Sequence, residues 1–299
     1  MRSRSWMEKR ASETTTFPRR IVCLTEETVE VLYLLGEQDR IVGVSGFACR
    51  PREAREKPRV SAFITAKIDR IVALEPDLVV GFSNLQGDIA RDLIRAGVNT
   101  LVFNQRSVEE IFRMILLLSR IVGAEEKGLA LCAKLRAGLG RVQESARRFS
   151  RRPRVFFEEW MDPLIGGIRW VEELIEIAGG EPVFPDLRRE QDAARRVVNP
   201  QAVVAAGPDV IIASWCGRKV SKKTIRERAG WRAVPAVRDG HIYEVKSTYI
   251  LQPGPAALTE GLFQLHAVLA RVAGAEPSRD VRPAERVDPD LEERTAGGK

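Results

Sequence analysis

Short runs of β-branched residues alternate with longer helical runs from Arg20 onward, and this alternation constrains the fold more than any other feature. In the first half of the chain, strands are predicted at residues 20–25, 40–45, 78–82 and 100–103. Helices are predicted between them at residues 28–35, 67–74 and 88–96. Such alternation is typical of parallel sheets covered by helices. The first half therefore predicts one complete α/β lobe.

The same pattern restarts near residue 154. Strands are predicted at 154–160, 210–214 and 241–245, with helices at 170–178, 200–206 and 256–272. A chain of 299 residues exceeds the usual size of one compact core. The predicted fold class is therefore α/β, with two Rossmann-like lobes of parallel sheet at residues 20–123 and 150–274.

A long helix is predicted between the lobes, at residues 124–149. It follows another predicted helix at 107–122, from which Gly123 separates it. Its apolar residues recur at three- and four-residue steps, as at Leu129, Cys132 and Leu135, which indicates an amphipathic helix. One helix should thus bridge the lobes, with a preformed ligand cleft between them.

Composition limits the partners and the compartment. Hydrophobic residues make up 44% of the chain, and the net charge of +7 lies in short clusters without interleaved aromatics, which argues against nucleic-acid binding. No apolar run approaches the length of a membrane span. Residues 1–19 are basic and polar, lack the apolar core of a secretion signal, and predict a flexible N-terminus and a cytoplasmic protein as the sequence stands. A charged, disordered tail is predicted at 275–299, and a monomer is expected.

Common catalytic motifs are absent from the sequence. The first strand–helix turn, CLTEETVEVL, carries no glycine and places two glutamates where a phosphate would lie. The chain has two histidines, His241 and His266, and neither is expected to be functional. Four scattered cysteines suggest free thiols, and no metal site is expected from the protein alone. We therefore expect no enzymatic activity.

Aromatic residues follow the predicted strands in both lobes. Because α/β proteins bind ligands at the carboxyl ends of their strands, these rings are candidate ligand contacts. The alternative is that each ring caps a core. Together they suit a large, flat, partly apolar ligand. The candidates are Phe47, Phe63, Phe82, Trp160, Trp215 and Tyr249. Trp170 is either a further candidate or simply the first residue of its helix.

Two cysteines and two glutamates lie near these rings. Cys49 is close to Phe47, and Cys216 follows Trp215, so either thiolate is a candidate ligand of a cobalt or iron centre, with Cys216 as the possible axial ligand. The alternative is a small packed thiol. Strand alternation directs only one of Glu158 and Glu159 toward the ligand.

Two segments carry a family resemblance: RIVCLTEETVEVLYLLGEQDRIVGVSGF from Arg20, and KIDRIVALEPDLVVGF from Lys67. EPDLVV recurs in looser form as GPDVII at Gly207. Over about residues 20–274 the chain resembles the cobalamin and iron-siderophore substrate-binding proteins of ABC importers. The cobalamin branch is most similar, because Phe47, Phe63, Phe82 and Tyr249 fall where that branch places aromatics.

The resemblance implies a periplasmic or cell-surface protein with a bound corrinoid as ligand, no intrinsic cofactor and an ABC permease as partner. Such proteins dock through one acidic residue on each lobe. Asp69 matches the first position, whereas Gln201 occupies the second. The hypothesis of a cytoplasmic corrinoid-holding homologue explains both Gln201 at the second docking position and the missing secretion signal.

Two further functions stay open. A haem or iron-siderophore binder would use arginines such as Arg50, Arg169 or Arg218 for anionic groups. A corrinoid- or metal-chelate-processing enzyme would use Glu159 or Cys216 as its reactive group.

Overall fold

The computed structural model describes residues 17–276, which form two compact units. The N-terminal lobe consists of the chain through Gln105 together with Phe112–Cys132. The C-terminal lobe consists of Arg106–Ile111 together with the chain from Ala133. Most of the predicted flexible N-terminus and nearly all of the predicted charged tail lie outside the described residues.

The N-terminal lobe is built on a parallel five-stranded sheet of order β3-β2-β1-β4-β5. The four predicted strands are confirmed, and one further strand, β3, was missed. The bounds are β1 (Ile21–Cys23), β2 (Ile41–Ser45), β3 (Arg59–Ser61), β4 (Leu78–Phe82) and β5 (Thr100–Phe103). All five carboxyl ends therefore lie at one edge of this sheet.

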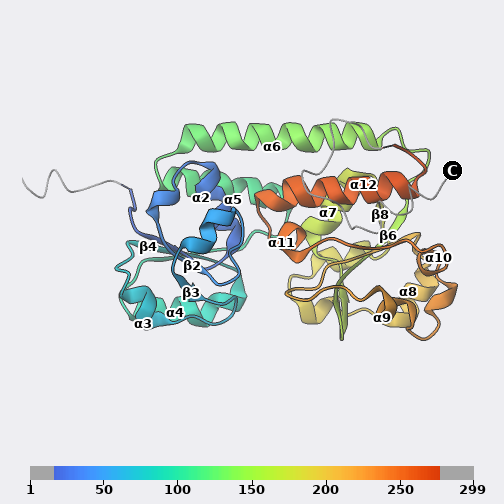
Figure 1. Cartoon of the computed structure of the whole chain (residues 1–299), viewed down its shortest axis with the longest axis horizontal. Helices are drawn as coiled ribbons and strands as arrows, with labels where there is room; N and C mark the ends of the chain where they lie inside the picture. The colour runs from blue at the N-terminus through green and yellow to red at the C-terminus, as the bar shows by residue number, and fades with distance from the viewer. Residues whose placement is uncertain (1–16, 277–299) are drawn as a thin grey trace, which may run out of the picture. The chain divides into compact units, whose positions relative to one another are not determined.

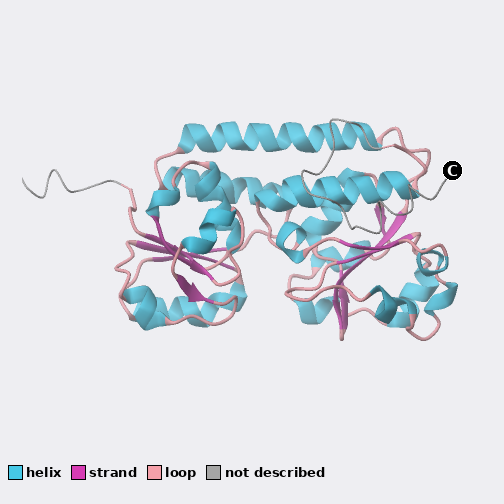
Figure 2. Cartoon of the chain, viewed as in Figure 1, coloured by secondary structure: helices cyan, strands magenta, loops and turns pink. Residues whose placement is uncertain are grey.

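Helices cover both faces of this sheet, as Figures 1 and 2 show. One face carries Val22 and Leu24, which pack with Ile71 of α3 and with Ile89 and Leu93 of α4. The other face is covered by α2 and by the part of α5 that belongs to this lobe. The helices are α2 (Glu26–Leu34), α3 (Ile68–Val72), α4 (Gly87–Arg95) and α5 (Val108–Ile121), with 3-10 segments η1 (Gln38–Arg40), η2 (Arg52–Glu56) and η3 (Asn84–Gln86).

The predicted long helix is confirmed as α6, which spans Glu125–Ala146. Gly123, with a φ of 73°, separates it from α5 as predicted, because glycine adopts this left-handed conformation without strain. The helix ends before Phe149. It contributes residues to both lobes, through Cys132 to the N-terminal lobe and from Ala133 to the C-terminal lobe.

The C-terminal lobe contains a second five-stranded sheet, in the order β10-β9-β6-β7, with β8 also paired to β6. Its strands are parallel except β7, which runs antiparallel to β6. The three predicted strands are confirmed, and the two short strands β7 and β8 were missed. The bounds are β6 (Arg154–Met161), β7 (Leu164–Gly166), β8 (Glu181–Pro182), β9 (Val210–Ala213) and β10 (Ile242–Glu244).

The helices of this lobe include the three that the sequence predicts, and α12 lies beside α7 (Figure 1). A π-helical segment, η7 (Ala257–Gly261), precedes α12. The helices are α7 (Arg169–Ala178), α8 (Pro200–Ala206), α9 (Lys222–Arg226), α10 (Pro235–Arg238), α11 (Ser247–Ile250) and α12 (Leu262–Val272), with 3-10 segments η4 (Pro185–Arg189), η5 (Ala193–Arg196) and η6 (Trp231–Ala233).

His266 of α12 joins three helical segments inside this lobe. Its ring is fully buried and stacks on Phe149 at 5.2 Å between centroids. Nδ1 lies 3.0 Å from the Ala178 carbonyl oxygen and Nε2 lies 2.9 Å from Ser145 Oγ. Because a carbonyl only accepts, Nδ1 carries the proton and Nε2 accepts from the Ser145 hydroxyl. His266 is therefore a structural residue held in its neutral form.

We expect the free energy of unfolding to fall as the pH drops below about 6.5, the ordinary histidine pKa. Burial, opposed by the bond to Ala178 and reinforced by Arg148, lowers the pKa of folded His266, so the unfolded chain binds its proton first on acidification. This contribution is complete above the unfolded pKa and is lost as the pH falls through the folded one. Urea unfolding across this range should show a shallower pH slope in His266→Gln.

Candidate functional site

An exposed apolar surface lies at the carboxyl edge of the N-terminal sheet. Phe47 follows β2 and is 51% exposed, Ile64 follows β3 and is 64% exposed, and Leu85 follows β4 and is 57% exposed. Phe63, beside Ile64, is half-buried. We call Phe47, Phe63, Ile64 and Leu85 the apolar face. An exposed patch of large apolar side chains is a common feature of binding surfaces.

Gln86 ties the loops of the apolar face together. Its side chain is fully buried, and its Oε1 accepts a hydrogen bond from the Phe82 amide at 2.9 Å. Its Nε2 donates to the carbonyl oxygens of Phe63 at 2.8 Å and Leu24 at 3.4 Å. A Cβ on Gly81 would lie 2.5 Å from Gln86 Oε1, so the glycine makes room for this amide. One side chain thereby fixes the loops after β1, β3 and β4.

The β1–α2 turn has no phosphate cradle. The Glu27 side chain is buried and accepts a hydrogen bond from Thr25 Oγ1 at 2.6 Å. Burial raises the pKa of Glu27 to about 8 and that of the neighbouring Cys23 thiol to about 12. A buried carboxyl and an inert thiol do not bind phosphate, which agrees with the absence of glycines in the turn.

The predicted aromatic candidates divide into solvent-accessible rings and buried rings. Phe47, Phe63 and Trp160 keep exposed surface, whereas Phe82, Trp170, Trp215 and Tyr249 are each 6% exposed or less. Trp170 lies in the first turn of α7, where its indole donates to the Ile250 carbonyl at 2.9 Å. The accessible aromatic surface among the candidates therefore comes from Phe47, Phe63 and Trp160.

Trp160 is the accessible aromatic candidate of the C-terminal lobe. Its indole nitrogen donates to the Asp162 carbonyl at 3.0 Å, and the guanidinium carbon of Arg218 lies 5.9 Å from its ring centre. Arg218 and Trp160 thus form a cation–π pair at the end of β6.

Of the candidate thiols, Cys216 is exposed and Cys49 is half-buried. Burial and then Glu26 raise the pKa of the Cys49 thiol, which disfavours the thiolate that a metal would need. Among the described residues no group of three or more His, Cys, Asp or Glu side chains is placed to hold a metal ion. Nor does any helix there have the length and apolarity needed to cross a membrane.

The paired glutamates of β6 have separate partners. Glu158 is fully buried and binds both terminal nitrogens of Arg228, at 2.6 and 2.8 Å, while Trp215 Nε1 donates to it at 3.1 Å. Glu159 pairs instead with the buried Arg196. Both carboxylates therefore serve to anchor arginines.

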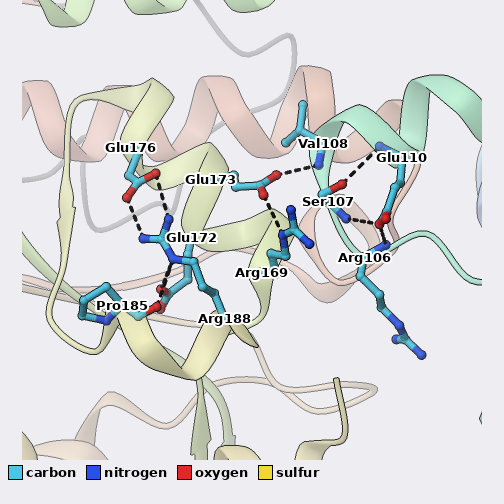
Figure 3. Close-up of polar contacts among 10 residues, drawn as sticks. All are labelled: Arg106, Ser107, Val108, Glu110, Arg169, Glu172, Glu173, Glu176, Pro185 and Arg188. Atoms are coloured by element: carbon cyan, nitrogen blue, oxygen red, sulfur yellow. Dashed lines mark hydrogen bonds and ion pairs between the residues drawn. The ribbon is translucent and has the colours of Figure 1, made fainter. Parts of the chain in front are cut away.

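A second cluster surrounds the start of α7 (Figure 3). Ser107 and Glu110 form a capping box at the start of α5: the Glu110 amide donates to Ser107 Oγ at 3.2 Å, and the Ser107 amide donates to Glu110 Oε2 at 3.0 Å. The Val108 amide donates to Glu173 of α7 at 2.7 Å. These bonds fasten the segment at Arg106 to the C-terminal lobe.

Glu173 also holds Arg169, at 2.9 Å, and Glu176 holds Arg188 through two contacts of 2.6 and 3.2 Å. Glu172, behind Arg188, is buried, and this burial raises its pKa to about 7. Arginine and glutamate side chains thus alternate around the first turns of α7.

A family model described as periplasmic binding protein matches residues 21–249. The chain belongs to the periplasmic binding protein family. Members of this family are periplasmic or lipoprotein solute-binding proteins, so the predicted absence of enzymatic activity is confirmed. The predicted resemblance and the predicted α/β class with parallel sheets are confirmed as well.

Named relatives are similar over most of their length. An uncharacterised ABC transporter substrate-binding lipoprotein, YvrC of Bacillus subtilis, is 26% identical over 83% of this chain and 79% of its own. A vitamin B12-binding protein of Vibrio parahaemolyticus is 27% identical over 80% of this chain and 85% of its own. The periplasmic haem-binding protein RhuT of Roseiflexus has the same fold, with a TM-score of 0.74, 24% identity, and coverage of 85% of this chain and 99% of its own.

Proposed function

We propose that this periplasmic binding protein is the substrate-binding component of an ABC importer for cobalamin or a related corrinoid. The observation that carries the proposal is the apolar face, with Phe47 and its neighbours exposed at the carboxyl edge of the N-terminal sheet. A corrin ring offers a broad, partly apolar surface that such side chains cover well. The similarity to a vitamin B12-binding protein supports the same ligand class.

The permease contact belongs to the same proposal. Asp69 lies exposed on α3, and Gln201 lies exposed in the first turn of α8. Both positions are open to a partner protein. They remain our proposed docking residues, one on each lobe. In this role the protein would act outside the cytoplasmic membrane.

Haem or a ferric siderophore is the second candidate ligand. Five arginines around one small cavity of the C-terminal lobe favour it, because these chelates carry anionic groups. The similarity of the fold to a haem-binding protein is consistent with this alternative.

Titration of the purified protein separates these ligands. Cyanocobalamin, dicyanocobinamide, hemin and a ferric carboxylate siderophore would each be added while the visible spectrum and tryptophan fluorescence are followed. We expect saturation by a corrinoid at micromolar concentration. Saturation by hemin or the ferric carboxylate siderophore alone would replace the first candidate by the second, and saturation by none of them would refute both.

Phe47→Ala should weaken corrinoid binding about ten- to hundredfold, because burying a Phe ring contributes about 1.5–3 kcal/mol. Ile94→Ala is the matched control: Ile94 is 63% exposed in the same lobe, but it lies on α4 rather than at the strand ends. Equal affinities of the two variants would contradict a role for the apolar face.

A further inference from the structure

The C-terminal lobe encloses a small cavity lined by five arginines, which we call the arginine pocket: Arg106, Arg169, Arg188, Arg189 and Arg196. Its volume is about 80 Å³. Sites that enclose a whole organic ligand measure about 300–1,000 Å³. The arginine pocket therefore has room for one small group of a larger molecule and not for a metal-chelating ring.

Carboxylates pair with several of the arginines that line the pocket. Among the residues that line it, Glu190 is the acidic one. Arg169 donates a hydrogen bond from Nε to Glu173. Arg196 donates from Nη1 to Glu159 and to the Gly166 carbonyl oxygen. Because a guanidinium carries five N–H donors, these contacts orient the two arginines and leave other donors uncommitted among the described residues.

Arg196 gives the pocket a buried charge. Its side chain is 6% exposed, although a lone cation is costly to bury. Arg106 lines the same cavity, where burial and then the Arg196 charge lower its pKa against the opposing charges of Asp192, Glu110 and Glu159. Figure 3 shows the Arg106 side chain extending away from Glu110. Two neighbouring guanidinium groups at one cavity would be stabilised by an anion between them.

The start of α7 adds to this electrostatic environment. Ile168, Arg169 and Trp170 line the pocket at the amino end of this 10-residue helix. A helix N-terminus carries a partial positive charge that favours anions. Glu159 lies near the carboxyl end of β6, so its bond to Arg196 places the pocket at the edge where α/β proteins bind ligands.

We infer that the arginine pocket is an oxyanion subsite, in which Arg106, Arg169 and Arg196 bind one carboxylate or phosphate group of the transported ligand. This inference rests on the proposed ligand-binding function. It narrows the ligand to a metal chelate that carries an anionic group small enough to enter the pocket.

Arg169→Gln tests the subsite, because Arg169 is half-exposed and its replacement should not unfold the lobe. Arg136→Gln is the matched control, since Arg136 also pairs with a glutamate, Glu109, at 2.7 Å but does not line the pocket. Inorganic phosphate, compared with chloride at equal ionic strength, should raise the thermal midpoint of the wild type and of Arg136→Gln. The shift should be lost in Arg169→Gln and kept in part by Arg169→Lys. The inference would be overturned if phosphate raised the thermal midpoint equally in the wild type and in all three variants, or if it did not raise that of the wild type.

Two ligand pairs identify the source of the oxyanion. Hemin and its dimethyl ester differ in free carboxylates, whereas cobalamin and cobinamide differ in the nucleotide loop with its phosphodiester. Within the pair that binds, Arg169→Gln should reduce the affinity of the anionic member about tenfold and leave the other member unchanged. Equal losses for both members would overturn the subsite. If no chelate binds, the proposed function fails, while the phosphate shift still decides the subsite independently.

Discussion

Arg228→Met is expected to lower the free energy of unfolding by about 3–5 kcal/mol, the usual cost of removing one partner of a buried ion pair. Glu158 is fully buried, and Arg228 supplies both of its charged contacts at 2.6 and 2.8 Å. Without Arg228, the indole of Trp215 would be the remaining partner described for this carboxylate. A neutral indole donor does not balance a buried charge.

Arg228 also packs on Trp231, with its guanidinium carbon 4.6 Å from the ring centre. Trp231 is fully buried and forms part of the core with Phe156, so the pair joins β6 to the segment around η6. Arg228→Met should therefore destabilise the whole C-terminal lobe rather than cause local fraying.

Chemical denaturation measures this effect. Arg147→Met is the matched control, because Arg147 and Glu144 form an exposed pair with both side chains 69% accessible, and exposed pairs contribute little. The double variant Glu158→Met/Arg228→Met should recover much of the loss, since it removes the charge together with its partner. If Arg228→Met were no less stable than Arg147→Met, the buried pair would not have the structural role that its geometry indicates.

The contacts of Glu158 with Arg228 and Trp215 show why the sequence predicts which aromatic residues follow a strand but not how exposed their rings are. Trp215 follows β9 as the sequence predicts, yet it is buried because its indole bonds to Glu158, which lies 57 residues earlier in the chain. Trp170 is withdrawn for a similar reason, through the Ile250 carbonyl 80 residues away. Such partners are set by tertiary packing, which local patterns do not contain.

Regular strands were predictable because their residues repeat a strong local signal. β4 and β5 match their predicted ranges, since both are runs of β-branched and apolar residues. β3 and β7 were missed, because each has three residues and directly follows the loop that holds Pro58 or Pro163. Proline close to a run is a signal for loops, and three residues are too few to show alternation.

The arginine pocket was only partly predictable. Arg169 was a candidate for anionic ligands, but Arg106 and Arg196 come from segments far from it in the sequence. The helix predicted at 107–122 already placed the start of α5 beside Arg106, and the spacing of Ser107 and Glu110 in the capping box agrees with that start. No local signal indicates that the three arginines converge.

Gln86 was not predicted at all, although it has the most direct effect on the proposed ligand surface. A lone glutamine after a strand carries no sequence signal, and its role appears only when the loops after β1, β3 and β4 are brought together. This residue links the fold of the N-terminal lobe to the placement of the apolar face.

Gln86→Leu is accordingly expected to affect both stability and binding. The Phe82 amide would lose its acceptor inside the protein, at a cost of about 1–3 kcal/mol, and the carbonyl groups of Phe63 and Leu24 would lose their donor. The loop that contains Phe63 and Ile64 would then no longer be held in place by Gln86. Corrinoid affinity should fall about tenfold or more, because the loops must be ordered again when ligand binds.

Two measurements separate these effects. Hydrogen exchange should become faster at the Phe82 amide in Gln86→Leu, and ligand titration of the folded variant should show the weaker binding. Gln143→Leu, an exposed glutamine on α6, is the matched control and should leave both unchanged. When its side chain is ionised, Gln86→Glu keeps an acceptor for Phe82 but cannot donate to the two carbonyl groups, so it should protect the amide while still weakening binding. If Gln86→Glu bound ligand as tightly as wild type, the donor bonds to Phe63 and Leu24 would not be what positions the apolar face.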